Sequence, residues 1–391
     1  MKYKFAHLAD CHLGSWRDPI LHDLGLQHFS KVIDICLLEK VDFVLIAGDL
    51  FNNALPSVDV LKFTIQQLKR LENQAIPVYI IAGSHDYSPA GKTMLHILEE
   101  TGLVKNVLDG TIDQKLQLSF ITDKKTNVQL CGILGRANSL EKQHFELLDR
   151  ELLEQSTHTE KIFLFHTTVT EMVDSLNEFM ESIPLSFFPK GFRYYAGGHI
   201  HIRKIQDFAD FGRFVYPGPV FPNSFQELED LEQGSFVINT VSKNSIESQF
   251  RYVQLYPTVS ICVDCTKKDP QAIVEEINRY DVENKIVLLR LIGKLSFSYS
   301  QLALPDFKQA YTVLKNTAKL ETQEFETTQL EKRETTQEFI EKHIGQFPSP
   351  VENERELIRQ LLISLDSKKG DGETQTDFEK RIVQTVERLF E

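Results

Sequence analysis

Acid and imidazole side chains follow five separate apolar stretches of the sequence, and each of them could ligate a metal ion. The first two stretches end in Asp10-Cys11-His12 and Gly48-Asp49, and the third ends in Gly83-Ser84-His85-Asp86. The fourth ends at His166 and the fifth at Gly197-Gly198-His199-Ile200-His201. Mixed imidazole and carboxylate ligands suit manganese, iron or zinc, and they do not suit magnesium or calcium alone.

Each motif taken alone also has a simpler explanation. Asp10 and His12 can form ordinary loop hydrogen bonds, and Gly48-Asp49 can be a common turn. His199 and His201 are a stronger signal, because side chains alternate along an extended chain and both rings then point to the same side. Recurrence of such residues at successive strand ends favours a metal centre. One shared carboxylate can hold two ions about 3.5–4 Å apart, the spacing used for phosphoryl displacement.

Short apolar runs and helical patterns alternate over residues 1–240. This alternation predicts an α/β layered domain. The predicted strands are Tyr3–Ala9, Phe43–Ala47, Val78–Ala82, Gln129–Leu134, Ile162–Phe165, Phe192–Ala196, Phe214–Tyr216 and Ser235–Asn239. A helical pattern, Val58–Leu71, separates the second strand from the third. Because the carboxyl ends of neighbouring strands share one edge of a sheet, we expect the five turns to meet in one crevice.

A second pattern covers residues 250–320 and predicts a small α+β module. Its predicted elements are a strand Thr258–Val263, a helix Pro270–Tyr280, a strand Lys285–Ile292 and a helix Asp306–Leu314. After residue 321 the sequence becomes polar, and Pro348-Ser349-Pro350 predicts a hinge. The predicted units are 1–245, 246–320, a linker 321–349 and 350–391.

Two amphipathic stretches end the chain on either side of a flexible turn, Ser367–Gly372. The apolar stripe of the first consists of Leu357, Ile358, Leu361, Leu362 and Leu365, and that of the second of Phe378, Ile382, Val383, Val386, Leu389 and Phe390. Such stripes either dock a partner or fold back as a helical hairpin. The preceding prolines and polar residues favour partner docking.

Composition and charge narrow the class of protein. The 391 residues are 41% hydrophobic and 25% charged, which excludes collagen-like and wholly disordered chains. Five cysteines suit a reducing compartment, and neither a signal peptide nor a membrane span is expected, so we expect a soluble, cytoplasmic protein. The net charge of −13 argues against a generally basic nucleic-acid binder. Residues 321–391 hold 17 acidic and 10 basic residues, so −7 of that charge lies there.

Together, the motifs resemble those of the calcineurin-like metallophosphoesterase superfamily. Within it, Ala47–Phe51 with Pro56-Ser57, Gly197–His201 and Tyr216-Pro217-Gly218 are similar to the SbcD-type nuclease, a subunit of a DNA double-strand-break repair complex. The archaeal form is closest in size. The resemblance implies a two-sheet metallophosphoesterase sandwich flanked by helices (1–245), a capping domain (246–320) and a helix-loop-helix (350–391). It also implies docking on an SbcC-type coiled-coil ATPase and homodimerisation through Val58–Leu71 and Lys92–Glu100.

The resemblance also implies roles for individual residues. One manganese ion would be held by Asp10, His12, Asp49 and His201. The second would be held by Asp49, His166, His199 and, more weakly, Ser84, with iron as the alternative metal. His85 would be the general acid, and Asn52, Tyr87 and Arg17 would contact substrate. Two positions depart from the family pattern, because Ser84 stands where Asn is usual and Asn52 where many members have His.

The implied function is a manganese-dependent exonuclease or endonuclease that acts at DNA ends. Protein phosphatases share the metal ligands, but their motif carries an Arg where this chain has Asn52-Asn53-Ala54. A phosphodiesterase for small nucleotides would not need the capping module or the paired helices. A weakly catalytic scaffold that bridges DNA ends or ATPase subunits is the third alternative, which Ser84 leaves open.

Overall fold

The computed structural model describes residues 2–87, 93–136, 141–173, 181–321, 357, 360–361 and 375–387. The chain divides into two compact units, Met1–Lys294 with Ser300–Leu320, and Leu295–Tyr299 with Glu321–Glu391. Among the described residues, no helix combines the length and the apolar composition that a membrane span requires.

The first unit is built on two six-stranded sheets. The strands of the first sheet are β1 (Tyr3–Leu8), β2 (Phe43–Ala47), β3 (Val78–Ile81), β4 (Lys105–Asn106), β13 (Gly234–Val241) and β14 (Ile246–Val253). Those of the second are β7 (Ile121–Thr122), β8 (Gln129–Ile133), β9 (Lys161–His166), β10 (Tyr194–Gly198), β11 (Arg203–Asp207) and β12 (Arg213–Pro217). The strand orders are β14-β13-β1-β2-β3-β4 and β11-β12-β10-β9-β8-β7.

Parallel pairing places the carboxyl ends of the central strands together. Strands β1, β2 and β3 are parallel neighbours in the first sheet, and β8, β9 and β10 are parallel neighbours in the second. The turns that follow these strands therefore lie at one edge of each sheet, where ligands bind in α/β proteins. All eight predicted strands are confirmed, with shifts of one or two residues at most of their ends.

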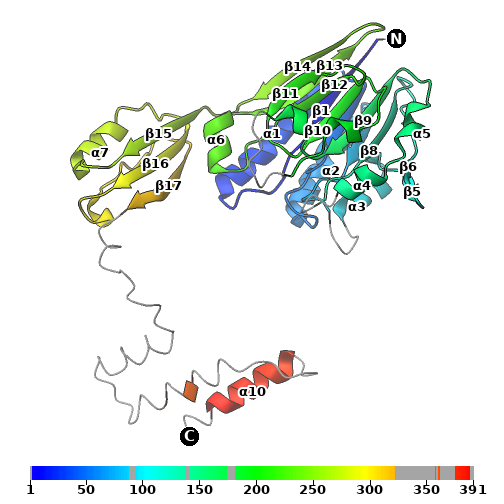
Figure 1. Ribbon diagram of the computed structural model, residues 1–391. Helices are drawn as coiled ribbons and strands as arrows, with labels where there is room; N and C mark the ends of the chain where they lie inside the picture. Colours follow the sequence, from blue (N-terminus) through cyan, green and yellow to red (C-terminus); the bar gives the residue numbers. More distant parts are fainter. Residues whose placement is uncertain are drawn as a thin grey trace. The chain divides into compact units, whose positions relative to one another are not determined.

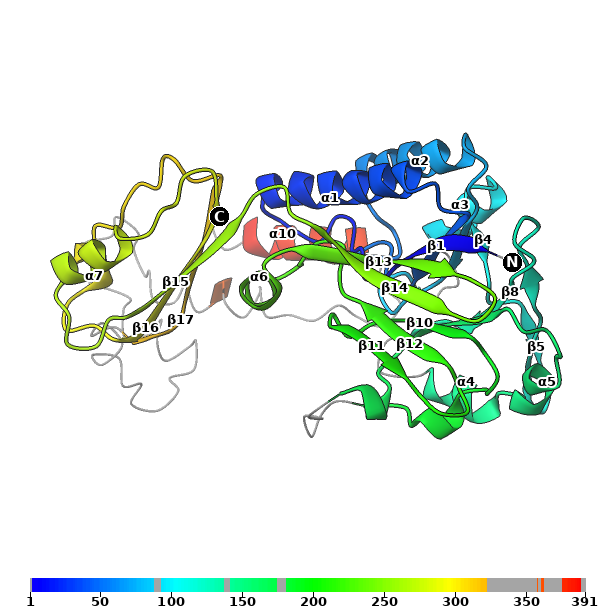
Figure 2. The same cartoon turned by 90° about the horizontal axis from the view of Figure 1, so that it is seen from above.

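Helices cover the outer faces of the two sheets, and the sheets pack against each other (Figures 1 and 2). The helices of the first unit are α1 (Pro19–Leu38), α2 (Val58–Glu72), α3 (Met94–Glu100), α4 (Lys142–Leu147), α5 (Arg150–Glu154), α6 (Phe225–Leu231) and α7 (Pro270–Ile277). Between the sheets, Phe5, Phe43 and Tyr194 are fully buried in one cluster. Helices α1 and α2 pack on the other face of the first sheet through residues such as Phe29 and Leu68. This confirms the predicted two-sheet α/β sandwich flanked by helices.

A smaller three-stranded sheet follows, with the strands β15 (Thr258–Asp264), β16 (Ile286–Lys294) and β17 (Thr312–Glu321) in that order. The predicted helix Asp306–Leu314 is wrong, because a turn at residues 308–310 leads into β17. The periodicity of a short apolar run does not distinguish a helix from a strand. Here, pairing with β16 makes residues 312–321 a strand. The domain boundary at 245/246 stays a prediction. The remaining elements are the hairpin strands β5 (Gly110–Ile112) and β6 (Leu116–Leu118) and 3-10 turns at Thr170–Met172, Leu185–Phe187 and Tyr299–Gln301.

The described part of the second unit includes one long helix, α10 (Gln375–Glu387). Phe378, Ile382 and Val386 recur on one stripe of it and are less exposed than Val383, whose exposed fraction is 54%. Leu357 and Leu361 are also described and partly buried. The other predicted partner-binding residues lie outside the described residues: Ile358, Leu362, Leu365 and Leu389.

Candidate metal centre

The turns that follow β1 and β2 in the first sheet are joined by backbone hydrogen bonds. Asp10, His12 and Asp49 have left-handed backbones, with φ of 51°, 41° and 52°. Such conformations cost about 1–3 kcal/mol each in non-glycine residues and gather at functional sites. Two backbone hydrogen bonds hold them, from the His12 amide to the Asp49 carbonyl (2.9 Å) and from the Asp10 amide to the Gly48 carbonyl (3.2 Å).

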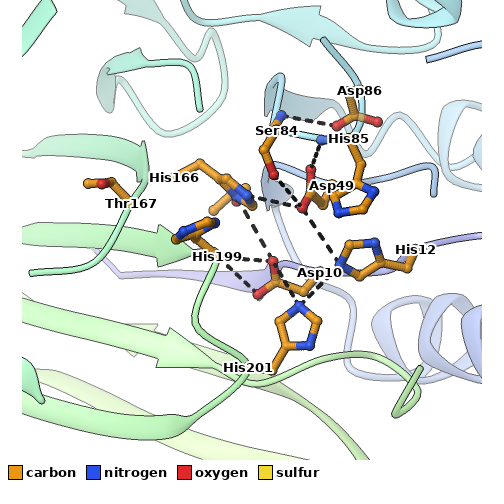
Figure 3. Close-up of polar contacts among 12 residues, drawn as sticks. Asp10, His12, Asp49, Ser84, His85, Asp86, His166, Thr167, His199 and His201 are labelled. Atoms are coloured by element: carbon orange, nitrogen blue, oxygen red, sulfur yellow. Dashed lines mark hydrogen bonds and ion pairs between the residues drawn. The ribbon is translucent and has the colours of Figure 1, made fainter. Parts of the chain in front are cut away.

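Four side chains from the two sheets converge above these turns (Figure 3). The Nε2 atoms of His12 and His201 lie 3.1 Å apart. His201 Nε2 lies 3.8 Å from Asp10 Oδ1, and His12 Nε2 lies 3.6 Å from Asp49 Oδ2. Asp10, His12 and Asp49 are no more than 3% exposed. The structure thus brings together the four residues that the sequence predicts as ligands of the first ion.

His166 forms a second group with the same carboxylates. Its Nδ1–H donates to the carbonyl oxygen of Ala47 (2.8 Å), so Nε2 faces Asp49 Oδ2 at 3.1 Å. This buried Nε2 makes no hydrogen bond with acceptable geometry to any described residue. A buried nitrogen without such a partner is costly, and a cation would satisfy it together with the carboxylate.

His199 and Ser84 flank the second group. The His199 ring packs edge-on against the His166 ring with centroids 5.2 Å apart, while its backbone amide donates to Asp10 Oδ1 (2.9 Å). The Ser84 hydroxyl lies 3.4 Å from Asp49 Oδ2. Among the described His, Cys, Asp and Glu residues, His199 joins no cluster of three ligand atoms as close as those around Asp10 and Asp49. The metal ligation of His199 and Ser84 stays a prediction.

Burial and charge set opposite protonation states in the centre. Burial lowers the pKa of His12 to about 3 and that of His199 to about 4, so both rings are neutral, the form that ligates metals. Burial also acts to lower the pKa of His166, but the Asp49 carboxylate outweighs it and raises that pKa to about 10. The pair Asp49–His166 therefore favours a positive charge between its two side chains, which a divalent cation also supplies. The donor set as a whole fits such a cation.

His85 is the exposed member of the constellation. Its backbone amide donates to Asp49 Oδ1 (2.8 Å), and its Nδ1–H donates to the carbonyl oxygen of Asn52 (2.9 Å). The ring stands edge-on to His12 with centroids 4.8 Å apart. Because Nδ1 is occupied by a backbone carbonyl, Nε2 is the ring nitrogen that remains able to exchange a proton.

Two carboxylates support the centre in ways that the sequence motifs do not predict. Asp86, 1% exposed, accepts hydrogen bonds from the amides of Leu50, Phe51 and Gly83, so it ties the turn after β2 to the turn after β3. Burial and nearby Asp49 raise the pKa of Asp86 to about 6. Glu227 Oε1 lies 3.0 Å from His201 Nδ1. In the sequence, Glu227 is recognisable only as the last residue of the pattern Ser-x-x-Glu that begins at Ser224. This pattern predicts a helix start and gives no indication of the contact with His201.

The three predicted substrate-binding residues have different surroundings. Asn52 contacts His85 through its backbone carbonyl. The Tyr87 hydroxyl accepts a hydrogen bond from Arg136 (2.7 Å), whose guanidinium lies 4.8 Å from the ring centroid. Arg17 is exposed. Their contacts with substrate stay predictions.

Glycine is required at position 83 by close packing against Asp49. A Cβ there would overlap both Asp49 Oδ1 and the Asp49 backbone nitrogen. Because the turns are fixed by Asp86, we expect Gly83→Ala to lower the free energy of unfolding by about 1–3 kcal/mol, measured by chemical denaturation. The control is Gly25→Ala, where a Cβ on α1 would make an ordinary 3.5 Å contact with Phe221. Equal stability of the two variants would contradict this packing argument.

Comparisons with known proteins show the family of this chain. Residues 3–203 match the calcineurin-like phosphoesterase family. The DNA double-strand break repair protein Mre11 of Archaeoglobus fulgidus is 29% identical over 263 residues, covering 64% of this chain but only 57% of that protein. The protein of the same name from Saccharolobus solfataricus is 25% identical over 387 residues, covering 92% and 94% of the two chains. A dimetal phosphatase structure from Danio rerio aligns with a TM-score of 0.41 and 10% identity, covering 64% of this chain and 96% of that one.

Proposed function

We propose that this chain, which belongs to the calcineurin-like phosphoesterase family, is a manganese-dependent nuclease that hydrolyses phosphodiester bonds at DNA ends. The observation that carries the proposal is the convergence of Asp10, His12, Asp49, His166 and His201 beside the exposed ring of His85. The relatives named as double-strand break repair proteins support DNA as the substrate.

The residues of the centre have three kinds of role, namely metal ligation, proton transfer and support of the turns. Asp10, His12, Asp49 and His201 would hold one ion, and Asp49, His166, His199 and Ser84 would hold the other. Divalent ions bound there would act as Lewis acids on the phosphate. His85 Nε2 protonates the leaving 3′-oxygen, with its ring held by the Asn52 carbonyl. Asp86 keeps the turns that carry Asp49 and His85 in register.

The choice of DNA over a small phosphate ester is tested by comparing substrates. We would measure cleavage of linear and hairpin DNA, p-nitrophenyl phosphate and bis-p-nitrophenyl phosphate by the full chain with manganese. Asn52-Asn53-Ala54 supplies no arginine to grip a monoester, so cleavage of DNA is expected and monoester hydrolysis is not. Monoester hydrolysis with intact DNA would instead assign a phosphatase.

Two associations complete the proposal. We propose a homodimer through α2 and α3. Val58 on α2 and Ile97 on α3 have exposed fractions of 78% and 45%, and Leu55 in the turn before α2 is 63% exposed. We also propose that the chain acts in the cytoplasm with an SbcC-type coiled-coil ATPase in double-strand-break repair. The apolar stripe of α10, with Phe378, Ile382 and Val386, would dock on this ATPase.

Removing residues 346–391 is expected to abolish co-purification with this ATPase, because both predicted docking stripes lie in that segment. Manganese-dependent DNA cleavage should persist, since every residue of the metal centre precedes residue 202. Pull-down with the tagged ATPase measures the first effect, and cleavage by the isolated variant measures the second. Retained co-purification would contradict the docking proposal.

A further inference from the structure

Helix α6 is attached to the metal centre at its first turn. Glu227 Oε1 lies 3.0 Å from His201 Nδ1, while Nε2 of the same ring faces Asp10 and His12. The other carboxylate oxygen of Glu227 accepts a hydrogen bond from the Asn223 amide (3.0 Å), so the carboxylate is fixed from two sides. A carboxylate on the outer nitrogen of a ligating imidazole sets the orientation and basicity of the ring.

The carboxyl end of α6 is attached to the same segment of chain. Arg203, two residues after His201, donates to the carbonyl oxygens of Leu231 (3.1 Å) and Gln233. Its Nε donates to Ser235 Oγ (3.0 Å). The segment that carries His201 therefore holds α6 at both ends, so a displacement of the helix is transmitted to the imidazole.

The small sheet, strands β15 to β17, is attached to α6 through residues of β15 and β16. Arg290 on β16 donates through Nε to Glu229 Oε1 (3.0 Å) and through Nη2 to Glu229 Oε2. The same guanidinium lies 4.9 Å from the ring centroid of Phe225. On β15, the Thr258 hydroxyl donates to the carbonyl oxygen of Glu232 (3.0 Å).

An apolar cluster joins the three parts. Leu228 on α6 is fully buried among Leu21 and Leu24 of α1 and Ile286 and Leu288 of β16. Figure 1 shows α6 beside α1 and the strands of the small sheet. A close-packed contact of this kind resists independent movement of its members. Helix α6 is therefore in contact with the small sheet on one side and with a ligand of the metal centre on the other.

We propose that Glu227 is a positioning residue for His201 and that α6 couples the small sheet to the metal centre through it. The inference rests on the proposed function only in taking His201 as a metal ligand. A displacement of the small sheet would change metal affinity through Arg290, Glu229 and Glu227, and by linkage metal binding would favour one position of the sheet.

The first test is manganese binding to the full-length protein, measured by titration calorimetry and by the electron paramagnetic resonance signal of free manganese. We expect Glu227→Gln to weaken binding at one site about 10–100-fold. The matched control is Asp230→Asn, which changes an exposed carboxylate on the same helix. Thermal unfolding of the metal-free proteins identifies any variant that fails to fold. Unchanged manganese affinity in folded Glu227→Gln would overturn the positioning role.

The second test is a double-mutant cycle for the coupling. We expect Arg290→Gln to weaken manganese binding about 5-fold in the otherwise unchanged protein and to have no further effect beside Glu227→Gln. An equal effect of Arg290→Gln in both backgrounds, or no effect in either, would overturn the coupling. If the unaltered protein binds no manganese, the proposed function itself fails, which distinguishes that failure from failure of this inference.

Discussion

Replacing Asp49 with Asn is expected to remove binding of at least one manganese ion and to slow DNA cleavage by on the order of 10³-fold. Asp49 Oδ2 faces both His166 (3.1 Å) and His12 (3.6 Å), so its charge serves both groups of ligands. A bound ion that polarises the phosphate contributes several kcal/mol, and about 1.4 kcal/mol corresponds to a tenfold change in rate. Asn keeps the shape and an acceptor for the His85 amide but loses the negative charge.

Manganese stoichiometry by calorimetry and single-turnover DNA cleavage measure this effect. The matched control is Asp34→Asn, which removes a partly exposed carboxylate on α1 whose partner is Arg70. Surface pairs of that kind contribute about 0–1 kcal/mol, so the control should bind manganese and cleave DNA normally. Full manganese binding by Asp49→Asn would contradict a shared role of this carboxylate.

The second large effect is expected for His85→Ala, which should slow DNA cleavage about 10²–10⁴-fold while leaving manganese stoichiometry unchanged. The ring of His85 is exposed and its Nδ1 is held by the Asn52 carbonyl, so it is placed to exchange a proton through Nε2. Its backbone amide, which supports Asp49, is retained in the variant.

Comparison of binding with rate separates the two roles that His85 could have. If His85→Ala loses both manganese binding and DNA cleavage, His85 is a metal ligand, as its proximity to His12 and Asp49 would allow. That result would contradict its role as the general acid. The matched control is His22→Ala on α1, outside the centre, which should leave both binding and rate unchanged.

Five predicted ligands have ligand atoms that lie close together in the structure: Asp10, His12, Asp49, His166 and His201. Asp10, Asp49 and His166 come directly at or after buried strands, and parallel pairing places the ends of such strands at one edge. The sequence was less informative about the second group of ligands, around His166 and Asp49. The left-handed backbone of His199 (φ 98°) sends its amide to Asp10 and its ring toward His166, and no local pattern predicts this orientation.

Other features depend on contacts that are distant in the chain. Asp86 accepts hydrogen bonds from three backbone amides, two of which lie in another turn. Glu227 contacts the imidazole of His201, which lies 26 residues earlier in the chain. Neither role therefore has a sequence pattern of its own. Strand β17 owes its conformation to pairing in the small sheet. Helix α1 is different, because Asp18 and Pro19 form an ordinary helix start that is visible in the sequence itself.

The proposed function requires that these residues bind two manganese ions and that the protein cleaves DNA with them. The most direct measurement is cleavage of a labelled linear duplex by the metal-free full-length chain during titration with manganese, with bound manganese determined in the same samples. We expect no cleavage in the presence of a chelator and a cleavage rate that rises as the second ion binds. Cleavage in the chelator, or two bound ions with intact DNA, would contradict it.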